Sequence, residues 1–430
     1  MKSVLVLGGY GLIGSACCRA LGNAGFHVVG LGRSRAAALA AAPRQEWVIK
    51  DLRSLDSLAW KDLLAGVDVV VNAAGALQDG PDDDLALIHD TLIERICAAA
   101  GPDLRLVQIS AAGVALDAST EFFRSKARGD AHVTKASCDW VILRPTLVLA
   151  PEAYGGTALL RGAASLPGIL PSVLPDSLVQ TVHIDDLAAA VVAAARGDVP
   201  SGTIADITEA SARPLPELLG AIRAWQGIPE PRLRLHVPSA ALGFAGLVSD
   251  ALGWLGWRSP LRSTAVTVLR NGVRGDPGPW LTAGGDMPRG LDQTLAALSA
   301  TRQERFFARL YFILPLSVAV LSAFWLVSGL VALARPTAAA SVLDGSALPA
   351  WAIGASVFGG AFIDIALGLA ILRRQWCRTA ALGMMAVSAA YLLGGTLFVS
   401  DLWLDPLGPL VKVIPSIVLA LIVWLGVEER

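Results

Sequence analysis

Residues 3–14 read SVLVLGGYGLIG, and this stretch decides the fold of the N-terminal part of the chain. The apolar, partly β-branched run at residues 3–7 is typical of a strand buried on both faces of a parallel sheet. Gly8, Gly11 and Gly14 follow at a spacing that allows a tight turn, close approach of a pyrophosphate and close packing of helix on strand. A helix running from here through Gly25 would point its N–H groups and positive dipole end at the phosphates.

Five further apolar runs, each followed by a polar or small residue, predict the remaining strands, at residues 26–31, 47–49, 67–71, 104–109 and 140–143. Because these strands alternate with helical segments, we expect an α/β, Rossmann-type doubly wound parallel sheet. The second strand ends in Gly32-Arg33-Ser34 and lacks the acidic residue that would bind a ribose diol. Arg33 suits a 2′-phosphate and favours NADP over NAD, unless it is only a solvated loop charge.

The composition points to a second environment. The chain has 430 residues, a formal net charge of −1, 54% hydrophobic and only 17% charged residues. So low a charge content indicates that part of the chain contacts something other than water, and the balanced charge argues against nucleic-acid binding. The five cysteines form no CxxC pair and no cluster with histidines, so we predict no metal site.

Four long apolar stretches follow Arg305, at residues 310–334, 350–372, 379–400 and 407–427. Each is long enough to cross a hydrocarbon core, although the last contains Lys412 and Pro415, so we predict an all-α bundle of four transmembrane helices. Arginines gather before the first span and between the second and third, at residues 302, 305, 309, 373, 374 and 378. This distribution predicts a multi-pass protein with both termini in the cytoplasm, and the arginine- and alanine-rich composition indicates a bacterial inner membrane.

Five motifs carry a resemblance to a known family: GGYGLIG (8–14), KDL (50–52), NAAG (72–75), LRPT (143–146) and VHIDDLA (182–188). Together they resemble the atypical, extended short-chain dehydrogenase/reductases, in particular the NmrA-like proteins and the nucleotide-binding accessory subunit of mitochondrial complex I. The C-terminal spans resemble the DoxX-like membrane domain. The expected domains are a Rossmann domain at 1–200, a small substrate lobe at 201–305 and a DoxX-like domain at 306–430.

The resemblance implies the roles of individual residues. Pyrophosphate contacts are expected from Gly8, Gly11, Leu12 and Ile13, a 2′-phosphate contact from Arg33, adenine contacts from Asp51 and Leu52, and nicotinamide-ribose contacts from Ala73 and Ala74. Tyr10 and Lys126 complete the expected cofactor-binding set.

The catalytic position departs from the family pattern. The family uses a tyrosine and a lysine four residues later, whose spacing puts both on one helix face. The lysine holds the ribose and lowers the pKa of the phenol, which passes a proton during hydride transfer. Here Lys126 is present, but the tyrosine position holds Phe122. Ser110 matches a substrate-polarising serine or caps a turn, and Tyr10 and Tyr154 are either relocated acids or packing residues.

Two features remain open. Residues 240–257 are almost wholly apolar and form either a core helix of the lobe or a helix on the membrane surface. Asp364 lies inside the second span, where an ionisable residue marks function, unless it is a structural acid bonded to Ser388 or Tyr391.

The sequence therefore predicts a membrane-anchored, NADP-binding oxidoreductase acting on a small apolar or membrane-resident substrate such as a quinone or isoprenoid. The alternative is a non-catalytic NADP-binding module that stabilises a membrane complex or senses its redox state. Phe122 favours the alternative, and Lys126 is compatible with both.

Overall fold

The computed structural model describes residues 1–77, 79, 84–257, 259–346 and 348–427. Among these, contacts divide the chain into two compact units, Met1–Asp250 with Ser259–Ala308, and Ala251–Arg258 with Arg309–Arg430.

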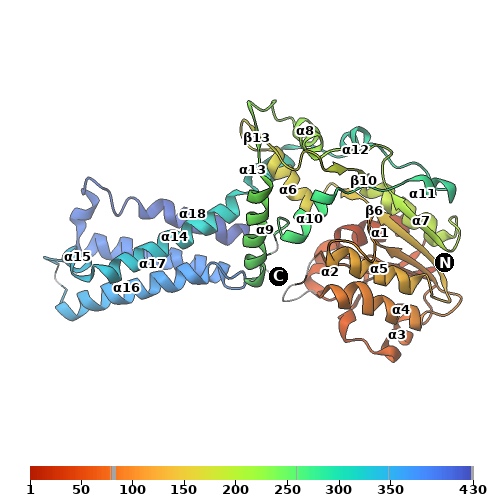
Figure 1. The fold of residues 1–430 in the computed structure, drawn as a ribbon. Helices are drawn as coiled ribbons and strands as arrows, with labels where there is room; N and C mark the ends of the chain where they lie inside the picture. Colours follow the sequence, from red (N-terminus) through yellow and green to blue (C-terminus); the bar gives the residue numbers. More distant parts are fainter. Residues whose placement is uncertain (78, 80–83, 258, 347, 428–430) are drawn as a thin grey trace. The chain divides into compact units, whose positions relative to one another are not determined.

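The first unit is built around a parallel sheet of seven strands, which confirms the predicted fold class (Figure 1). In spatial order the strands are β3 (Glu46–Ile49), β2 (His27–Gly32), β1 (Ser3–Leu7), β4 (Val69–Asn72), β5 (Arg105–Ile109), β6 (Asp139–Pro145) and β11 (Thr203–Ile207). The strand order reverses beside β1, so the crevice between the carboxyl ends of β1 and β4 is the place where such folds bind ligands.

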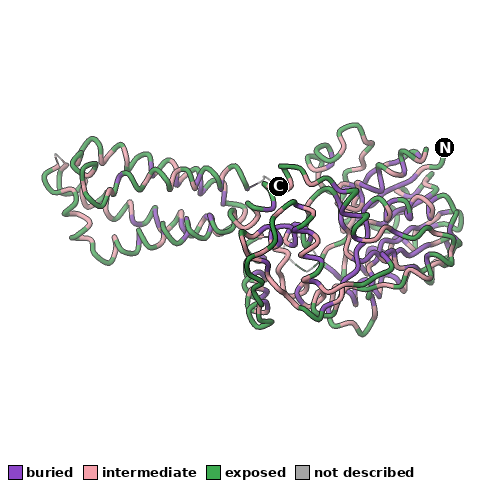
Figure 2. Tube along the Cα trace, turned by 90° about the horizontal axis from the view of Figure 1, so that it is seen from above, coloured by how far each residue is buried: buried purple, intermediate pink, exposed green. Residues whose placement is uncertain are grey.

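Helices cover both faces of this sheet, because successive side chains of its strands point to opposite sides. On one face Val4 and Val6 pack with α1 (Leu12–Asn23) and α7 (Ile184–Arg196). On the other face Leu5 and Leu7 pack with α3 (Ser57–Leu64), α4 (Leu92–Ala99) and α5 (Glu121–Val133). The burial pattern in Figure 2 shows this two-sided core as the densest buried part of the chain.

Shorter elements complete this unit. Its other helices are α2 (Arg35–Ala41), α6 (Gly155–Ala164), α8 (Leu215–Trp225), α10 (Ser263–Asn271), α11 (Gly278–Thr282) and α12 (Leu291–Ala297), with single turns η1 (Leu52–Ser54) and η2 (Leu87–Thr91). Helices α9 (Ser239–Trp254) and α13 (Arg302–Leu310) begin in this unit and end in the second. Three strand pairs join β7 (Leu147–Leu149) to β10 (Thr181–His183), β8 (Ile169–Ser172) to β13 (Leu233–His236), and β9 (Leu178–Val179) to β12 (Arg213–Pro214). A separate apolar core lies between α6, α8 and α12.

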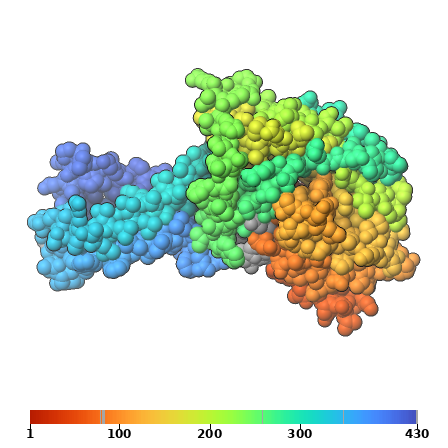
Figure 3. Space-filling model, in the orientation of Figure 1, coloured from red at the N-terminus to blue at the C-terminus, as the bar shows by residue number. Residues whose placement is uncertain are grey.

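Helix α9 is not the core helix that one interpretation of residues 240–257 predicted. Phe244, Leu247 and Trp254 are 69%, 66% and 79% exposed, and the helix lies at the molecular surface in Figure 3. The membrane-surface alternative stays a prediction.

The second unit is helical, with α14 (Ile313–Ala334), α15 (Pro336–Ser341), α16 (Ala350–Ala370), α17 (Cys377–Phe398), the turn η3 (Ser400–Trp403) and α18 (Val413–Gly426). Large apolar side chains such as Phe324, Leu330 and Leu397 are exposed on these helices, which water would disfavour and lipid would cover. Among the described residues three helices are long and apolar enough to cross a membrane: Arg302–Ala334, Ala350–Ala370 and Cys377–Phe398.

The fourth predicted span is shorter than expected. Helix α18 has 14 residues and, at about 1.5 Å per residue, is roughly 21 Å long, less than the roughly 30 Å of a hydrocarbon core. The residues just before α18, up to Lys412, form turns and not helix. Crossing of the membrane by α18 stays a prediction.

Asp364 lies at the meeting point of α14, α16 and α17 and is 5% exposed. Its carboxylate accepts hydrogen bonds from the Tyr391 hydroxyl at 2.9 Å and the Ser328 hydroxyl at 2.8 Å. One of the two expected partners, Tyr391, is therefore correct, while Ser328 on α14 takes the place expected for Ser388.

Candidate nucleotide-binding site

The turn after β1 has the conformation that a dinucleotide-binding turn requires. Gly8 adopts φ = +70°, and a Cβ on it would lie 2.9 Å from the carbonyl oxygen of Ala73. A Cβ on Gly14 would overlap the carbonyl oxygen of Gly8, so only glycine lets α1 start this close to the strand. Helix α1 begins at Leu12, with Gly11 as its N-cap residue. The first-turn N–H groups of Leu12 and Ile13, like those of any helix start, have no partner within the helix.

Tyr10 and Arg33 meet at the end of β2. The Tyr10 hydroxyl accepts a hydrogen bond from the Arg33 backbone N–H at 3.3 Å, and its ring lies 6.2 Å from that of Trp47. The Arg33 side chain is exposed just after the last residue of β2. Tyr10 thus packs against the second strand, beside the position from which Arg33 can reach a ligand at the sheet edge.

Asp51 follows β3, where its carboxylate caps the turn η1. The Arg53 guanidinium, 2.7 Å away, lowers the pKa of Asp51 by hydrogen bonding. Leu52 is the first residue of that turn and is half-buried.

Ala73 and Ala74 follow β4 and line the glycine turn. The Ala73 N–H donates to the Leu7 carbonyl at 3.1 Å, and the Ala74 N–H donates to the Asn72 side chain at 3.2 Å. The next residue, Gly75, lies within reach of two titratable groups: a Cβ there would be 3.5 Å from His89 Nε2 and 4.0 Å from Lys126 Nζ. The loop after β4 thus joins the glycine turn on one side to Lys126 on the other.

Lys126 lies on α5 and is 7% exposed. Its ammonium donates a hydrogen bond to the Ile109 carbonyl at 3.3 Å, at the end of β5, and lies 5.7 Å from the centre of the Phe122 ring. Burial lowers its pKa to about 8, although nearby Asp130 opposes the shift. The charged form of Lys126 is therefore disfavoured by its burial and would be stabilised by a further hydrogen-bond acceptor.

Ser110 does not simply cap a turn. Its hydroxyl donates to Asp130 Oδ2 at 2.9 Å, and the Arg144 guanidinium approaches the same oxygen at 2.8 Å. Burial raises the pKa of Asp130, against the opposing effect of Arg144. The other oxygen of Asp130 is buried and has no hydrogen-bond partner among the described residues. The sequence analysis missed this residue, although its position four residues after Lys126 places it on the same helix face.

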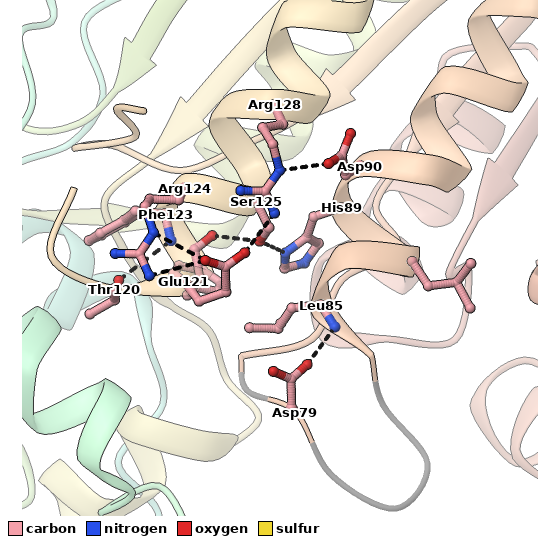
Figure 4. A network of polar contacts seen from close by, with 12 residues as sticks. Asp79, Leu85, His89, Asp90, Thr120, Glu121, Phe123, Arg124, Ser125 and Arg128 are labelled. Carbon is pink, nitrogen blue, oxygen red and sulfur yellow. Dashed lines mark hydrogen bonds and ion pairs between the residues drawn. The ribbon is translucent and has the colours of Figure 1, made fainter. Parts of the chain in front are cut away.

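His89 is a second residue that the sequence analysis missed. It lies on the π-helical turn η2 and points towards Ser125 on α5 (Figure 4). Its Nε2 accepts the Ala76 N–H at 3.2 Å, so the proton resides on Nδ1, which donates to the Ser125 hydroxyl at 3.0 Å. Burial, followed by the charge of Lys126, lowers the pKa of His89 to about 2. The neutral ring therefore ties the loop after β4 to the helix that carries Lys126.

Tyr154, a candidate acid in the sequence, and His183, from the VHIDDLA motif, both lie at helix starts. Tyr154 precedes α6 and is 62% exposed. His183 caps α7, where its Nδ1 accepts the Asp185 N–H at 3.0 Å. Among the residues that the structure describes, no group of three histidines, cysteines or carboxylates is arranged to hold a metal ion.

Taken together, the sheet order, the glycine turn and the buried lysine define a Rossmann domain with a dinucleotide site at the carboxyl ends of β1 and β4. Comparison with known families agrees, since residues 8–196 match the NAD(P)H-binding family and residues 322–421 match the DoxX-like family. The chain thus carries an NAD(P)H-binding Rossmann domain similar to atypical short-chain dehydrogenase/reductases, and a C-terminal DoxX-like domain. The predicted NAD(P)H-binding and DoxX-like domains are thus confirmed, whereas the narrower resemblance to the NmrA-like proteins and the complex I subunit stays a prediction.

Individual relatives are distant. The uncharacterized chloroplastic protein At1g32220 of Arabidopsis thaliana is 28% identical over 242 residues, which cover 49% of this chain and 78% of that protein. The crystal structure of the Bordetella bronchiseptica enzyme WbmH in complex with NAD+ is 20% identical, with a TM-score of 0.52 over 69% of this chain and 97% of that one. WbmG of the same organism, in complex with NAD and UDP, is 15% identical, with a TM-score of 0.54 over 71% and 96%. These structures support the fold.

Proposed function

We propose that this protein is a membrane-anchored NADP(H)-dependent oxidoreductase whose substrate is small and apolar or resident in the membrane, such as a quinone or isoprenoid. One observation carries the proposal: the loop after β4 contacts Gly8 at one end and approaches Lys126 at the other. A dinucleotide held at the glycine turn would therefore extend towards a buried lysine on α5.

Gly8 and Gly14 let the turn pack closely against Ala73 and let α1 start directly beside the turn. This is the backbone geometry that a dinucleotide-binding turn needs, so these residues fit the cofactor. A nicotinamide dinucleotide bound here would supply a hydride. Within this proposal Gly11, Leu12 and Ile13 bind the pyrophosphate, Tyr10 and Asp51 with Leu52 flank the adenosine, and Ala73 and Ala74 border the nicotinamide ribose.

Lys126 would hold the ribose hydroxyls. Its ammonium has three protons, and among the described residues only the Ile109 carbonyl accepts one of them in a hydrogen bond. The Ser110 hydroxyl donates to Asp130, so it would have to give up this hydrogen bond before it could donate to a substrate. We therefore assign Ser110 a smaller role than Lys126. Phe122 has no proton to give, so a reduced quinone would take its protons from water or from another side chain.

Arg33 is the basis for proposing NADP over NAD. Its exposed side chain follows the last residue of β2, where a 2′-phosphate would replace a ribose hydroxyl. Substitution Arg33→Ala should remove a charge-assisted contact of about 1.5–3 kcal/mol for NADPH and leave NADH binding almost unchanged. Calorimetry with both nucleotides checks this expectation. Equal affinities for the two, unaltered by the substitution, would refute the preference.

A second candidate function rests on Phe122. Since this ring cannot donate a proton, the domain could bind NADP without turnover and serve as a structural or redox-sensing module of a membrane complex. The full-length protein, purified in detergent, separates the two functions. Bleaching of NADPH absorbance on addition of a short-chain quinone supports the enzyme. Bound NADPH that persists with every quinone and isoprenoid aldehyde supplied supports the module.

The remaining expectations belong to this proposal. The helical unit would cross a bacterial inner membrane with both termini in the cytoplasm, and the first unit would divide into a Rossmann domain at 1–200 and a substrate lobe at 201–305. Cysteine labelling tests the orientation. A cysteine replacing Ser341 should react without permeabilisation, and one replacing Gln375 should require it.

A further inference from the structure

At one end of the helical unit, the turn between α16 and α17 and the first residues of α17 carry three arginines that each lie over a tryptophan ring. Guanidinium carbon to ring-centre distances are 4.4, 5.4 and 5.1 Å for the pairs Arg373–Trp376, Arg374–Trp257 and Arg378–Trp424. All three are within the roughly 6 Å at which a cation is attracted to an aromatic face. We call these six residues the arginine–tryptophan cluster.

The cluster is assembled from segments far apart in the sequence. The Trp257 indole N–H donates to the Leu372 carbonyl at 2.6 Å, and the Arg374 backbone N–H donates to the Leu255 carbonyl at 2.9 Å. These two bonds fix the segment before residue 258 against the turn that follows α16. Trp424 comes from the last helical residues of α18. The tertiary structure therefore brings the three pairs to the same end of the bundle.

The two ends of the bundle differ in charge. At the cluster end the described residues of this unit include four arginines and no carboxylate, with Arg309 as the fourth. The opposite connections contain three carboxylates and only two cations, at residues 344, 401 and 405 and at residues 335 and 412. The sequence after α18, Glu428-Glu429-Arg430, is outside the described residues. Among the described residues, the cluster end is thus the end with an excess of positive charge.

The side chains of the cluster suit a phosphate at a membrane surface. Stacking on a ring uses the flat face of a guanidinium, whereas its N–H donors lie in the plane and match phosphate oxygens in pairs. Tryptophan favours the headgroup level of a bilayer, and Trp376 is 52% exposed. Basic sites between membrane helices bind anionic lipid headgroups.

We propose that the arginine–tryptophan cluster is a binding site for the phosphate headgroups of anionic phospholipids. This inference requires the helical unit to lie in a bilayer, as proposed above, and is independent of any reaction at the nucleotide site. The headgroup phosphate would be bound by the edges of the guanidinium groups, and the tryptophan rings would hold these groups at the level of the membrane surface.

The test measures thermal unfolding and lipid retention of the full-length protein in mild detergent. Phosphatidylglycerol should raise the unfolding temperature more than phosphatidylcholine and should be retained preferentially in native mass spectra. The variant Arg373→Gln/Arg374→Gln/Arg378→Gln should lose this preference, by about fivefold in affinity per arginine. The matched control is Arg335→Gln/Lys412→Gln at the opposite end, which should retain it.

Three results would overturn the proposal: equal stabilisation by the two lipids, an equal loss in the control variant, or the same stabilisation by inorganic phosphate alone. Should the triple variant fail to fold, Arg373→Gln gives the same test with an exposed side chain, and an unchanged lipid preference in that variant would count against the site. Membrane insertion is checked separately by alkaline extraction of native membranes. Failure of the lipid preference can therefore be distinguished from failure of the membrane assignment.

Discussion

Each unit buries a titratable group, Lys126 in the first and Asp364 in the second, and the two groups differ in their hydrogen-bond partners. We call each group with its neighbours the Lys126 centre and the Asp364 centre. Asp364 accepts bonds from two hydroxyls, those of Ser328 and Tyr391. Lys126 bonds to one carbonyl and faces the ring of Phe122. The lysine thus has beside it an aromatic ring without a hydroxyl, while a tyrosine hydroxyl is one of the two partners of the carboxylate.

We call the Asp364 centre saturated, because each oxygen of its carboxylate accepts a hydrogen bond. We call the Lys126 centre unsaturated, because among the described residues its ammonium has one hydrogen-bond acceptor for three protons. Buried polar groups with all their partners stabilise a unique packing, whereas a buried ammonium with donors to spare is costly unless a ligand completes it. The Asp364 centre is therefore expected to stabilise the helical unit, and the Lys126 centre to gain its missing partners from a bound nucleotide. Substitutions at either centre, or at the glycine turn and the histidine linked to the Lys126 centre, test this difference.

The largest expected effect comes from giving the Lys126 centre the phenol that it lacks. Phe122→Tyr should raise NADPH-dependent reduction of simple ketones by about 10²–10⁴-fold over an almost inactive parent, because a positioned general acid contributes that much. Steady-state NADPH oxidation measures it. The double variant Phe122→Tyr/Lys126→Met retains the phenol without its lysine and should lose the gain. An inactive Phe122→Tyr protein that binds NADPH normally would favour the non-catalytic module.

The next effect concerns the turn that places the nucleotide. Gly14→Ala should weaken NADPH binding by about 10–100-fold, because the added methyl group overlaps the Gly8 carbonyl and forces α1 away from β1. Fluorescence titration of the full-length protein measures the affinity. Gly22→Ala, on the exposed side of the same helix with no atom near its new Cβ, is the matched control and should bind normally. Similar losses in both variants would mean that helix stability, and not the close approach, limits binding.

Much of the sheet and its glycine turn could be predicted from the sequence. The apolar runs located six of the seven strands of the sheet to within a few residues, since strands buried on both faces need continuous apolar sequence. The glycine spacing located the turn for a similar reason, as its constraint is local. The short α18 was not foreseen, because hydropathy alone does not register the turns before Val413.

The site was predictable only in its local parts. Lys126 followed from its position in a motif, but His89 and Asp130 acquire their environments from tertiary contacts. His89 meets a hydroxyl 36 positions away on another helix, and Asp130 meets Ser110 and Arg144 at the ends of two strands. A lone histidine between the apolar residues of segment 85–93 was the one signal that could have indicated a buried imidazole.

Removing the acid of the saturated centre should have an intermediate effect. Asp364→Leu leaves the hydroxyls of Ser328 and Tyr391 without their acceptor inside the bundle and should lower the free energy of unfolding by about 1–3 kcal/mol. NADPH affinity should stay unchanged. Ser356→Ala is a suitable control on the same helix, because among the described residues that exposed hydroxyl bonds only to the carbonyl of Ala352. A loss of NADPH binding equal to the loss of stability would show that the two centres are coupled.

The smallest expected effect is a pH dependence of stability that belongs to the Lys126 centre. His89 has a pKa of about 2 in the folded protein against an ordinary 6.5, so the folded state binds fewer protons than the unfolded state below about pH 6.5. Its contribution to stability is complete above that pH and declines as the pH falls, by about 0.7 kcal/mol between pH 7 and pH 6. His89→Gln retains an acceptor for the Ala76 N–H and a donor for Ser125, and should flatten this slope. Denaturant unfolding of the detergent-solubilised protein at the two pH values measures the difference, with exposed His236→Gln as the control. An unchanged slope in His89→Gln would mean that the imidazole becomes protonated without unfolding, and that it does not tie the loop after β4 to α5 in the way its hydrogen bonds indicate.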